Sequence, residues 1–107
     1  MSFRRPTAEE KSMLAELCKL AGCPNSDALD DIWVEPMSDG RMGGVRLSLR
    51  LPQVPDRKFA NQISALSFSD ADGTAVSAVL NVDQFGELFE LDMWKVDFSP
   101  LQRWPEF

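Results

Sequence analysis

The sequence contains no histidine and only two cysteines among its 107 residues. Histidine is the most common general base and metal ligand in proteins, so this chain alone cannot form a Ser-His or Cys-His nucleophile. Cys18 and Cys23 are too few for a disulfide framework and are expected to be free thiols, with a redox pair as the alternative. A zinc site would need the two cysteines together with carboxylates as ligands, which is an improbable set. We therefore expect no metal, no cofactor and no catalytic residue, and predict that the protein is not an enzyme.

Long hydrophobic runs and nucleotide-binding motifs are also absent. No apolar run approaches the ~18–20 residues that a membrane-spanning helix needs. The start, Met1 to Pro6, is basic and leads into Thr7-Ala8-Glu9-Glu10 instead of an apolar segment, so a signal peptide is not expected. The glycine-rich stretch Gly40-Arg41-Met42-Gly43-Gly44 lacks the spacing of a phosphate-binding loop and is interpreted as a hairpin turn. These features predict a cytoplasmic protein that does not bind membranes.

Acidic residues are unevenly distributed along a chain of ordinary globular composition and of a length that fits one domain, residues 1–107. Residues 1–58 carry nine basic and nine acidic side chains, which cancel. Residues 59–107 carry two basic and eight acidic side chains, so two minus eight gives the whole net charge of −6. The eight acids are Asp70, Asp72, Asp83, Glu87, Glu90, Asp92, Asp97 and Glu106. Such a surface disfavours direct nucleic-acid binding and attracts a basic protein.

Residues 8–21 have the pattern of an amphipathic helix. Thr7 and Glu10 have capping-box spacing, and apolar residues follow at helical intervals. Gly22 suits a left-handed cap, and Pro24 cannot continue the helix. The following residues, 23–31, are rich in turn-forming types and are expected to form an irregular connector.

Five segments have the composition or alternation of β-strands. The expected strands are residues 32–35, 45–51, 63–69, 76–82 and 87–96. Asp72-Gly73 and residues 83–86 are expected turns, and residues 98–107 are expected to form an irregular strap. The sequence therefore predicts an α+β fold in which the N-terminal helix packs on an antiparallel five-stranded meander sheet.

The last expected strand indicates a binding surface. Its alternation predicts that Phe89, Leu91 and Met93 face the core and that Leu88, Glu90, Asp92, Trp94 and Val96 face the other way. Carboxylates beside an exposed indole are typical of an interface, since Trp is enriched at binding hot spots. The predicted partner-binding residues are Asp83, Glu87, Glu90, Asp92, Trp94 and Asp97. The alternative is that Arg46 and Arg50 pair with Glu90 and Asp92 and that the strap covers Trp94, which would leave no recognition surface.

Two acidic motifs have other interpretations. Glu90 and Asp92 share one face of the expected strand about 7 Å apart, a separation compatible with acid–base catalysis, while a solvated surface pair is the simpler interpretation. Asp70-Ala71-Asp72-Gly73 is similar to the start of a calcium loop, but the twelfth position is Asn81, where a bidentate Glu is required. A hairpin turn is the preferred interpretation of that motif.

Two stretches, Phe68-Ser69-Asp70-Ala71-Asp72-Gly73 and VDQFGELFELDMWKVDFSPL at residues 82–101, resemble a group of small bacterial proteins that end in an acidic-aromatic strand and a Phe-Ser-Pro-Leu step. The chain is also similar in size and charge to immunity proteins of contact-dependent growth inhibition and other polymorphic toxin systems. This resemblance implies binding to a cognate toxin domain, which in such systems is often a basic nuclease. Toxin-contacting residues differ among immunity proteins, so no residue role is carried over.

The leading hypothesis is an immunity protein that occludes a basic toxin domain stoichiometrically and is itself a monomer or weak dimer. One alternative is a small carboxylate-based enzyme or ligand-binding domain that uses Glu90 and Asp92 in a cleft. Another is an adaptor that forms a homodimer through its exposed sheet face. A pocket holding both carboxylates would favour the first alternative, and sedimentation would reveal the dimer of the second.

Overall fold

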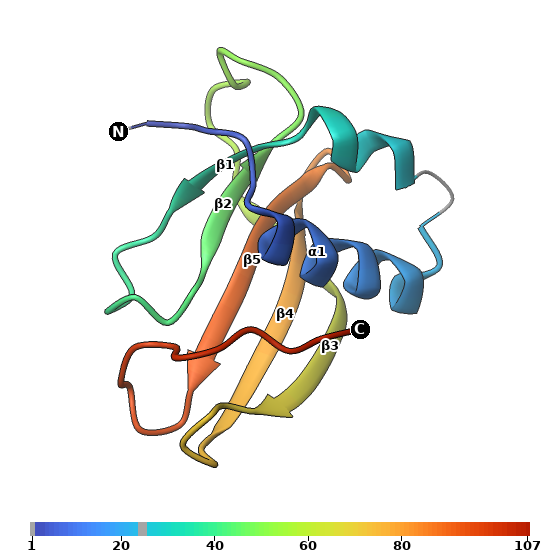
Figure 1. Cartoon of the computed structure of the whole chain (residues 1–107). Helices are drawn as coiled ribbons and strands as arrows, with labels where there is room; N and C mark the ends of the chain where they lie inside the picture. The colour runs from blue at the N-terminus through green and yellow to red at the C-terminus, as the bar shows by residue number, and fades with distance from the viewer. Residues whose placement is uncertain (1, 24–25) are drawn as a thin grey trace.

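The computed structural model describes residues 2–23 and 26–107. It shows the expected α+β fold, in which one helix packs on a five-stranded antiparallel sheet (Figure 1). The elements are α1 (Ala8–Ala21), the 3₁₀ helix η1 (Ser26–Asp31), β1 (Trp33–Pro36), β2 (Val45–Ser48), β3 (Phe59–Ser69), β4 (Ala75–Asp83) and β5 (Leu88–Lys95). No helix within the described residues is long and apolar enough to cross a membrane.

Helix α1 has the predicted bounds and caps. The Thr7 hydroxyl accepts a hydrogen bond from the Glu10 amide at 3.1 Å, and the Glu10 carboxylate accepts one from the Thr7 amide at 2.8 Å. Gly22 ends the helix in the left-handed conformation, at φ 71°. The buried face of the helix is apolar and lies against β3 and β4. The capping box and the Gly22 cap are therefore confirmed.

The connector after α1 differs from the expectation. Residues Ser26–Asp31 form a 3₁₀ helix instead of an irregular loop. Leu29 and Ile32 are buried in the core, which gives this short helix an apolar anchor. Pro24 and Asn25, which were part of the predicted turn, lie outside the described residues.

The strand order corrects the predicted meander. The order is β1-β2-β5-β4-β3, so only β3, β4 and β5 follow one another as a meander. The last strand lies between β2 and β4, and the chain from β2 to β3 passes β5 and β4 to reach the far edge of the sheet. Leu91 and Met93 of β5 are 0% and 1% exposed, in keeping with the place of this strand in the interior of the sheet.

Arg57 fixes the chain where it makes this passage. Its guanidinium donates to the backbone carbonyls of Leu47 and Leu88 at 2.7 and 2.6 Å, and to Asp83 Oδ2 at 2.8 Å. Leu47, Leu88 and Asp83 belong to β2, β5 and β4, so one side chain joins the adjacent ends of three strands. The connection over residues 49–58 is thereby held at one end of the sheet.

The strand ends also differ from the pattern-based limits. Strand β2 ends at Ser48, because the Ser48 hydroxyl bonds the backbone of Arg50 and turns the chain. Leu51, which was expected to face the core, is 44% exposed. At the far edge, β3 starts at Phe59, before the predicted start at residue 63. The early part of β3 carries neither strict alternation nor burial, so sequence pattern gave no signal for it.

A β-bulge changes which residues of β5 face the core. Asn81 pairs with Glu90, whereas Val82 pairs with Leu88, so Phe89 is the extra residue. Leu88 packs against the core cluster, and Phe89 lies beside the Arg57 guanidinium, 5.1 Å from the ring centroid to Cζ. The predicted faces of Leu88 and Phe89 are therefore wrong, while those of Leu91 and Met93 are confirmed.

The C-terminal strap crosses the same face of the sheet as α1 (Figure 1). Leu101 and Trp104 pack against the core, and a side chain at Gly43 would lie 3.2 Å from Leu101 and 3.3 Å from Trp104. Gly43 also has φ 108°, which favours glycine. The strap and the turn before β2 thus fit closely together on the helix side of the sheet.

Candidate functional site

One face of the sheet carries no covering helix. Because side chains alternate along a strand, the register that places Leu47, Leu80 and Leu91 under α1 directs their neighbours to the opposite side. We call that side the open face; its residues are Glu35, Arg46, Glu90, Asp92, Trp94, Asn81, Val79, Ser77, Ala65 and Ser67. Its charged members are three acids and one arginine, so three negative charges and one positive leave −2.

Trp94 is the large aromatic residue of the open face. Its side chain is 47% exposed, and the Phe98 ring packs edge-on against it with 6.2 Å between centroids. Phe98 is itself 66% exposed. Only Phe98, at the start of the strap, reaches this indole, since Leu101 and Trp104 pack on the helix side of the sheet; Trp94 stays half-exposed, so the alternative that the strap buries it is wrong.

Glu90 and Asp92 keep their charge available. Within the described chain, neither carboxylate forms an ion pair. Glu90 accepts a hydrogen bond from Asn81 Nδ2 at 3.3 Å, and Asp92 is exposed. Arg46 lies directly opposite Glu90 in the register but makes no salt bridge to it. The predicted neutralisation by Arg46 is therefore not observed.

Asp83 does not belong to this surface. It is 1% exposed, and its two oxygens accept from the Arg57 guanidinium and from the backbone amides of Phe85 and Glu87. Burial alone would raise the pKa of Asp83, but the bond from Arg57 and the two amide bonds lower it below its ordinary value. The prediction that Asp83 meets a partner is therefore corrected: the residue closes the β4–β5 turn and holds the chain connection.

Glu87 and Asp97 lie at the two ends of β5. Glu87 forms an ion pair with Arg50, so Arg50 pairs with neither Glu90 nor Asp92 as the alternative required. Asp97 is exposed and accepts bonds from the Ser99 hydroxyl and amide at 2.7 and 3.0 Å, which lower its pKa. Both carboxylates are therefore already engaged within the chain, and Glu90, Asp92 and Trp94 form the part of the predicted set that the open face brings together.

Lys95 forms a buried ion network that charge counting missed. Its side chain is fully buried, and its Nζ lies 2.8 Å from both Asp70 Oδ2 and Asp72 Oδ2. Asp70 also accepts the backbone amides of Gln102 and Arg103, each at 2.9 Å. Burial opposes the charged form of Asp70, but the bonds from Lys95 and the amides hold its pKa well below the usual range. Asp70 and Asp72, two more of the eight acids in residues 59–107, therefore hold the fold together by pairing with Lys95.

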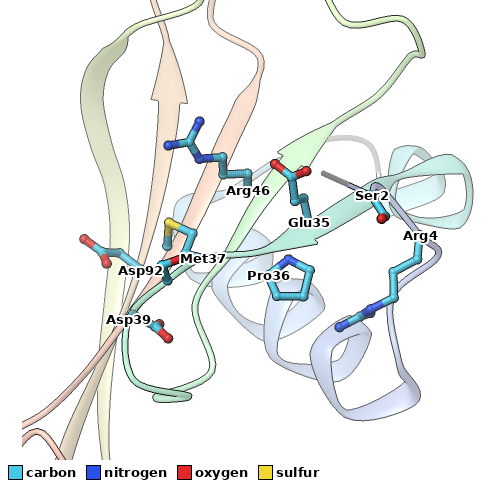
Figure 2. Close-up of a pocket in the computed structure, with 9 residues that line it drawn as sticks. Ser2, Arg4, Glu35, Pro36, Met37, Asp39, Arg46 and Asp92 are labelled. Carbon is cyan, nitrogen blue, oxygen red and sulfur yellow. The ribbon is translucent and has the colours of Figure 1, made fainter.

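A hollow of about 760 Å³ lies beside β1, at the border of the open face (Figure 2). Figure 2 shows side chains from β1, β2 and β5 around it, including those of Glu35, Arg46 and Asp92. Glu35 is only 6% exposed, and its Oε2 is buried without a hydrogen-bond partner in the described structure. Sequence reasoning missed Glu35, because a single acid in a short strand carries no signal of burial.

Metal-binding, carboxylate-based and thiol chemistry can each be compared with the described structure. No group of three or more His, Cys, Asp and Glu side chains that could hold a metal ion occurs among residues 2–23 and 26–107. The hollow that Asp92 lines does not include Glu90, so the pair does not converge there as the enzyme alternative requires. Both cysteines are free thiols. Burial is the main cause that raises the pKa of the Cys18 thiol to about 12, and a side-chain hydrogen bond with Cys23 is the second. A thiol with so high a pKa stays protonated and is therefore unreactive.

Fold and site together define a small α+β domain with one covered and one open sheet face. The chain belongs to a protein family described as a domain of unknown function, DUF6984, whose model matches residues 3–105. No curated protein and no solved structure matches the chain. The family description names no toxin or partner, so the likeness to immunity proteins stays a prediction.

Proposed function

We propose that this protein is an immunity protein, which binds a cognate basic toxin domain in the cytoplasm and occludes its active site through the open face. One observation carries the proposal: Glu90 and Asp92, free of ion pairs in the described chain, lie on the same sheet face as the half-exposed Trp94. A domain that needed these groups only for its own stability would pair or bury them.

The open face has the composition of an interface centre. Trp94 and Phe98 supply apolar surface that a partner can bury. The neighbouring side chains of Ser77 and Val79 are shorter, so the two rings project above the surface around them. A standard interface covers about 800 Å² per partner. That is about one eighth of the 6266 Å² surface of this chain, an area that one sheet face can supply.

A nuclease is the toxin class that this surface suits best. An enzyme that cleaves nucleic acid binds phosphates with Lys and Arg, so its substrate channel is cationic. Carboxylates at Glu90 and Asp92 complement such a channel and accelerate association, while the adjacent indole supplies affinity after contact. The same acids repel phosphate, which agrees with the expectation that the chain itself does not bind nucleic acid.

The test is co-expression with a candidate toxin domain, sought first in the gene directly upstream of this chain, scored for growth. The wild-type protein is expected to restore growth, and the double variant Glu90→Lys/Asp92→Lys is expected to lose that ability. The matched control Glu9→Lys/Glu106→Lys changes the net charge equally at the helix and strap, away from the open face, and should still protect. A toxic domain whose effect the wild-type chain leaves unchanged would refute the proposal.

A homodimeric adaptor is the second candidate, and edge strand β3 favours it. This strand, Phe59–Ser69, has no charged residue, although the chain carries a net charge of −6. Two copies could pair β3 with β3 about a two-fold axis without like-charge repulsion. Sedimentation at micromolar concentration tests this candidate, because a monomer at that concentration would exclude it.

A further inference from the structure

The Glu35 carboxylate is an unusual group for a chain of this size. It is 94% buried, since only 6% of the residue is exposed, and Oε2 has no hydrogen-bond partner among the described residues. A buried carboxylate is normally paired with a cation or with several donors, because desolvation of the charge is costly. Glu35 lines the hollow beside β1, so its carboxylate borders the space that a ligand could enter.

The other charged groups around the hollow leave Glu35 without a fixed cation. Arg4 is occupied by Glu10, with two bonds of 2.7 and 3.0 Å to its carboxylate. Asp39 accepts the amides of Met42 and Gly44 and shapes the turn before β2. Asp92 is exposed at the border and adds negative charge.

Arg46 is the remaining cation at this hollow, and it forms no salt bridge in the described structure. In the register it lies opposite Glu35 on one side and opposite Glu90 on the other. Figure 2 shows its guanidinium extending away from the Glu35 carboxylate. Arg46 therefore leaves both Glu35 and Glu90 without an ion pair in the described structure.

We propose that this hollow is the receptor for an arginine side chain of the partner, whose guanidinium pairs with Glu35 and is flanked by Asp92. The inference rests on the proposed function and adds the contact that anchors the partner. A guanidinium fits better than an ammonium, because it is planar, offers a fork of donors to a carboxylate and is weakly hydrated. Met37 and Pro36 line the same hollow and supply apolar contact for its flat faces. The volume of about 760 Å³ accommodates the side chain together with part of its backbone.

In this assignment, Arg46 and the partner arginine are two cations beside the same Glu35 carboxylate, so Arg46 opposes binding of the partner. Arg46 forms no ion pair with Glu35 in the described structure, so the arriving arginine displaces no existing pair but meets the positive charge of Arg46 beside the hollow. Loss of Arg46 should therefore strengthen binding of a guanidinium, whereas loss of Glu35 should weaken it. A role of both residues in folding alone would not produce opposite effects on ligand affinity.

The experiment uses acetyl-arginine-amide as the probe, titrated into the full ¹⁵N-labelled chain and followed by amide chemical shifts. Shifts at the β1 and β2 residues around Glu35 are expected, with a dissociation constant in the millimolar range for so small a ligand. Acetyl-citrulline-amide, which has the same shape without the charge, should give no shift. Equal shifts with the citrulline probe, or none with the arginine probe, would overturn the proposal.

Variants separate the receptor from general charge effects. Glu35→Gln should raise the dissociation constant at least about tenfold, as expected for loss of a charge-assisted pair, and Arg46→Gln should lower it. Glu9→Gln removes the same charge from the helix side and should leave it unchanged. If Glu35→Gln does not fold, Asp92→Asn replaces it, and an unchanged constant there would contradict the flanking role.

The two proposals fail in different ways. Arginine binding that persists while growth rescue fails would refute toxin neutralisation and support a receptor for a cationic partner of another kind. Growth rescue that survives Glu35→Gln, with no shift on arginine addition, would refute the receptor and leave the open face as the binding surface.

Discussion

Arg57 and Asp83 form a buried ion pair, with 2.8 Å between Nε and Oδ2, at the end of the sheet where β2, β4 and β5 meet. Their side chains are 5% and 0% exposed. The pair holds the connection that carries the chain across β5 and β4 to the far edge. It also explains why Asp83, which looks like a surface acid in the sequence, has no part in recognition.

Breaking this pair should destabilise the fold. Arg57→Ala leaves the Asp83 carboxylate buried without its cation and removes two bonds to backbone carbonyls. Loss of one partner of a buried pair costs about 3 kcal/mol, and urea unfolding would measure the change. Arg50→Ala is the control, because the exposed pair with Glu87 contributes less than about 1 kcal/mol. Equal effects of the two variants would refute the structural role given to Arg57.

The stability of the protein should depend on pH at both extremes. The pKa values of Asp70 and Asp83 are lowered in the folded state, so their contribution is present above the ordinary aspartate value of about 4 and is lost as the pH falls further. The pKa of Lys95 is raised against the effect of burial by its bonds to Asp70 and Asp72. Its contribution is present below about pH 10 and is lost as the pH rises through the folded value. Melting temperatures from pH 2 to pH 11 should show a plateau between about pH 5 and pH 8, because the raised pKa of the buried Cys18 thiol adds a loss of stability above the ordinary thiol value of about 8.5.

A melting temperature that rises on acidification below pH 4 would contradict these signs. Glu9→Gln serves as a control, since Glu9 is exposed and belongs to neither the Arg57–Asp83 pair nor the Lys95 network. It should leave the acid limb of the profile nearly unchanged, whereas Asp70→Asn should flatten it.

The Lys95 network should control how firmly the strap is attached. Asp70 accepts the amides of Gln102 and Arg103, and Lys95 Nζ donates to the Pro100 carbonyl at 3.3 Å. Asp70→Ala should therefore accelerate amide hydrogen exchange at Gln102 and Arg103 more than at residues in the centre of β4. Unchanged exchange at these two amides would show that other contacts hold the strap.

Substitutions of Trp94 and Trp104 should have different effects: loss of Trp94 should mainly weaken partner binding, and loss of Trp104 should mainly lower stability. Trp94→Ala removes a half-exposed ring and should lower the free energy of unfolding by less than about 1 kcal/mol while abolishing tight partner binding. Trp104→Ala removes a ring packed on the core and should cost about 2 kcal/mol. Denaturant unfolding and binding measurements on both variants check this, and a large loss of stability with Trp94→Ala would contradict an interface role.

Local chemistry made much of the fold predictable. Thr7, Glu10 and Gly22 specify the limits of α1 through hydrogen bonds and backbone conformation, and these act between residues close in sequence. The strand order was not predictable in the same way. It depends on contacts such as Arg57 with Leu88, which join residues far apart in the chain and leave no periodic signal.

The site was predictable only in part, because a charge count shows how many acids there are and not what they face. Alternation on β5 correctly directed Glu90, Asp92 and Trp94 away from the core. It could not show that Asp83 and Asp70 are buried beside cations, since their partners lie on other elements. Glu35 was missed for the converse reason: its burial comes from the arrangement around β1 and not from its sequence neighbours.

The central claim is that the open face binds a cationic protein through Glu90, Asp92 and Trp94. The most direct test is the affinity of the candidate toxin domain, measured by calorimetry at low and high salt, for the wild type, Glu90→Lys/Asp92→Lys and Glu9→Lys/Glu106→Lys. The account predicts that only the open-face variant loses most of its affinity and its salt dependence. Equal affinity and equal salt dependence in all three proteins would contradict it.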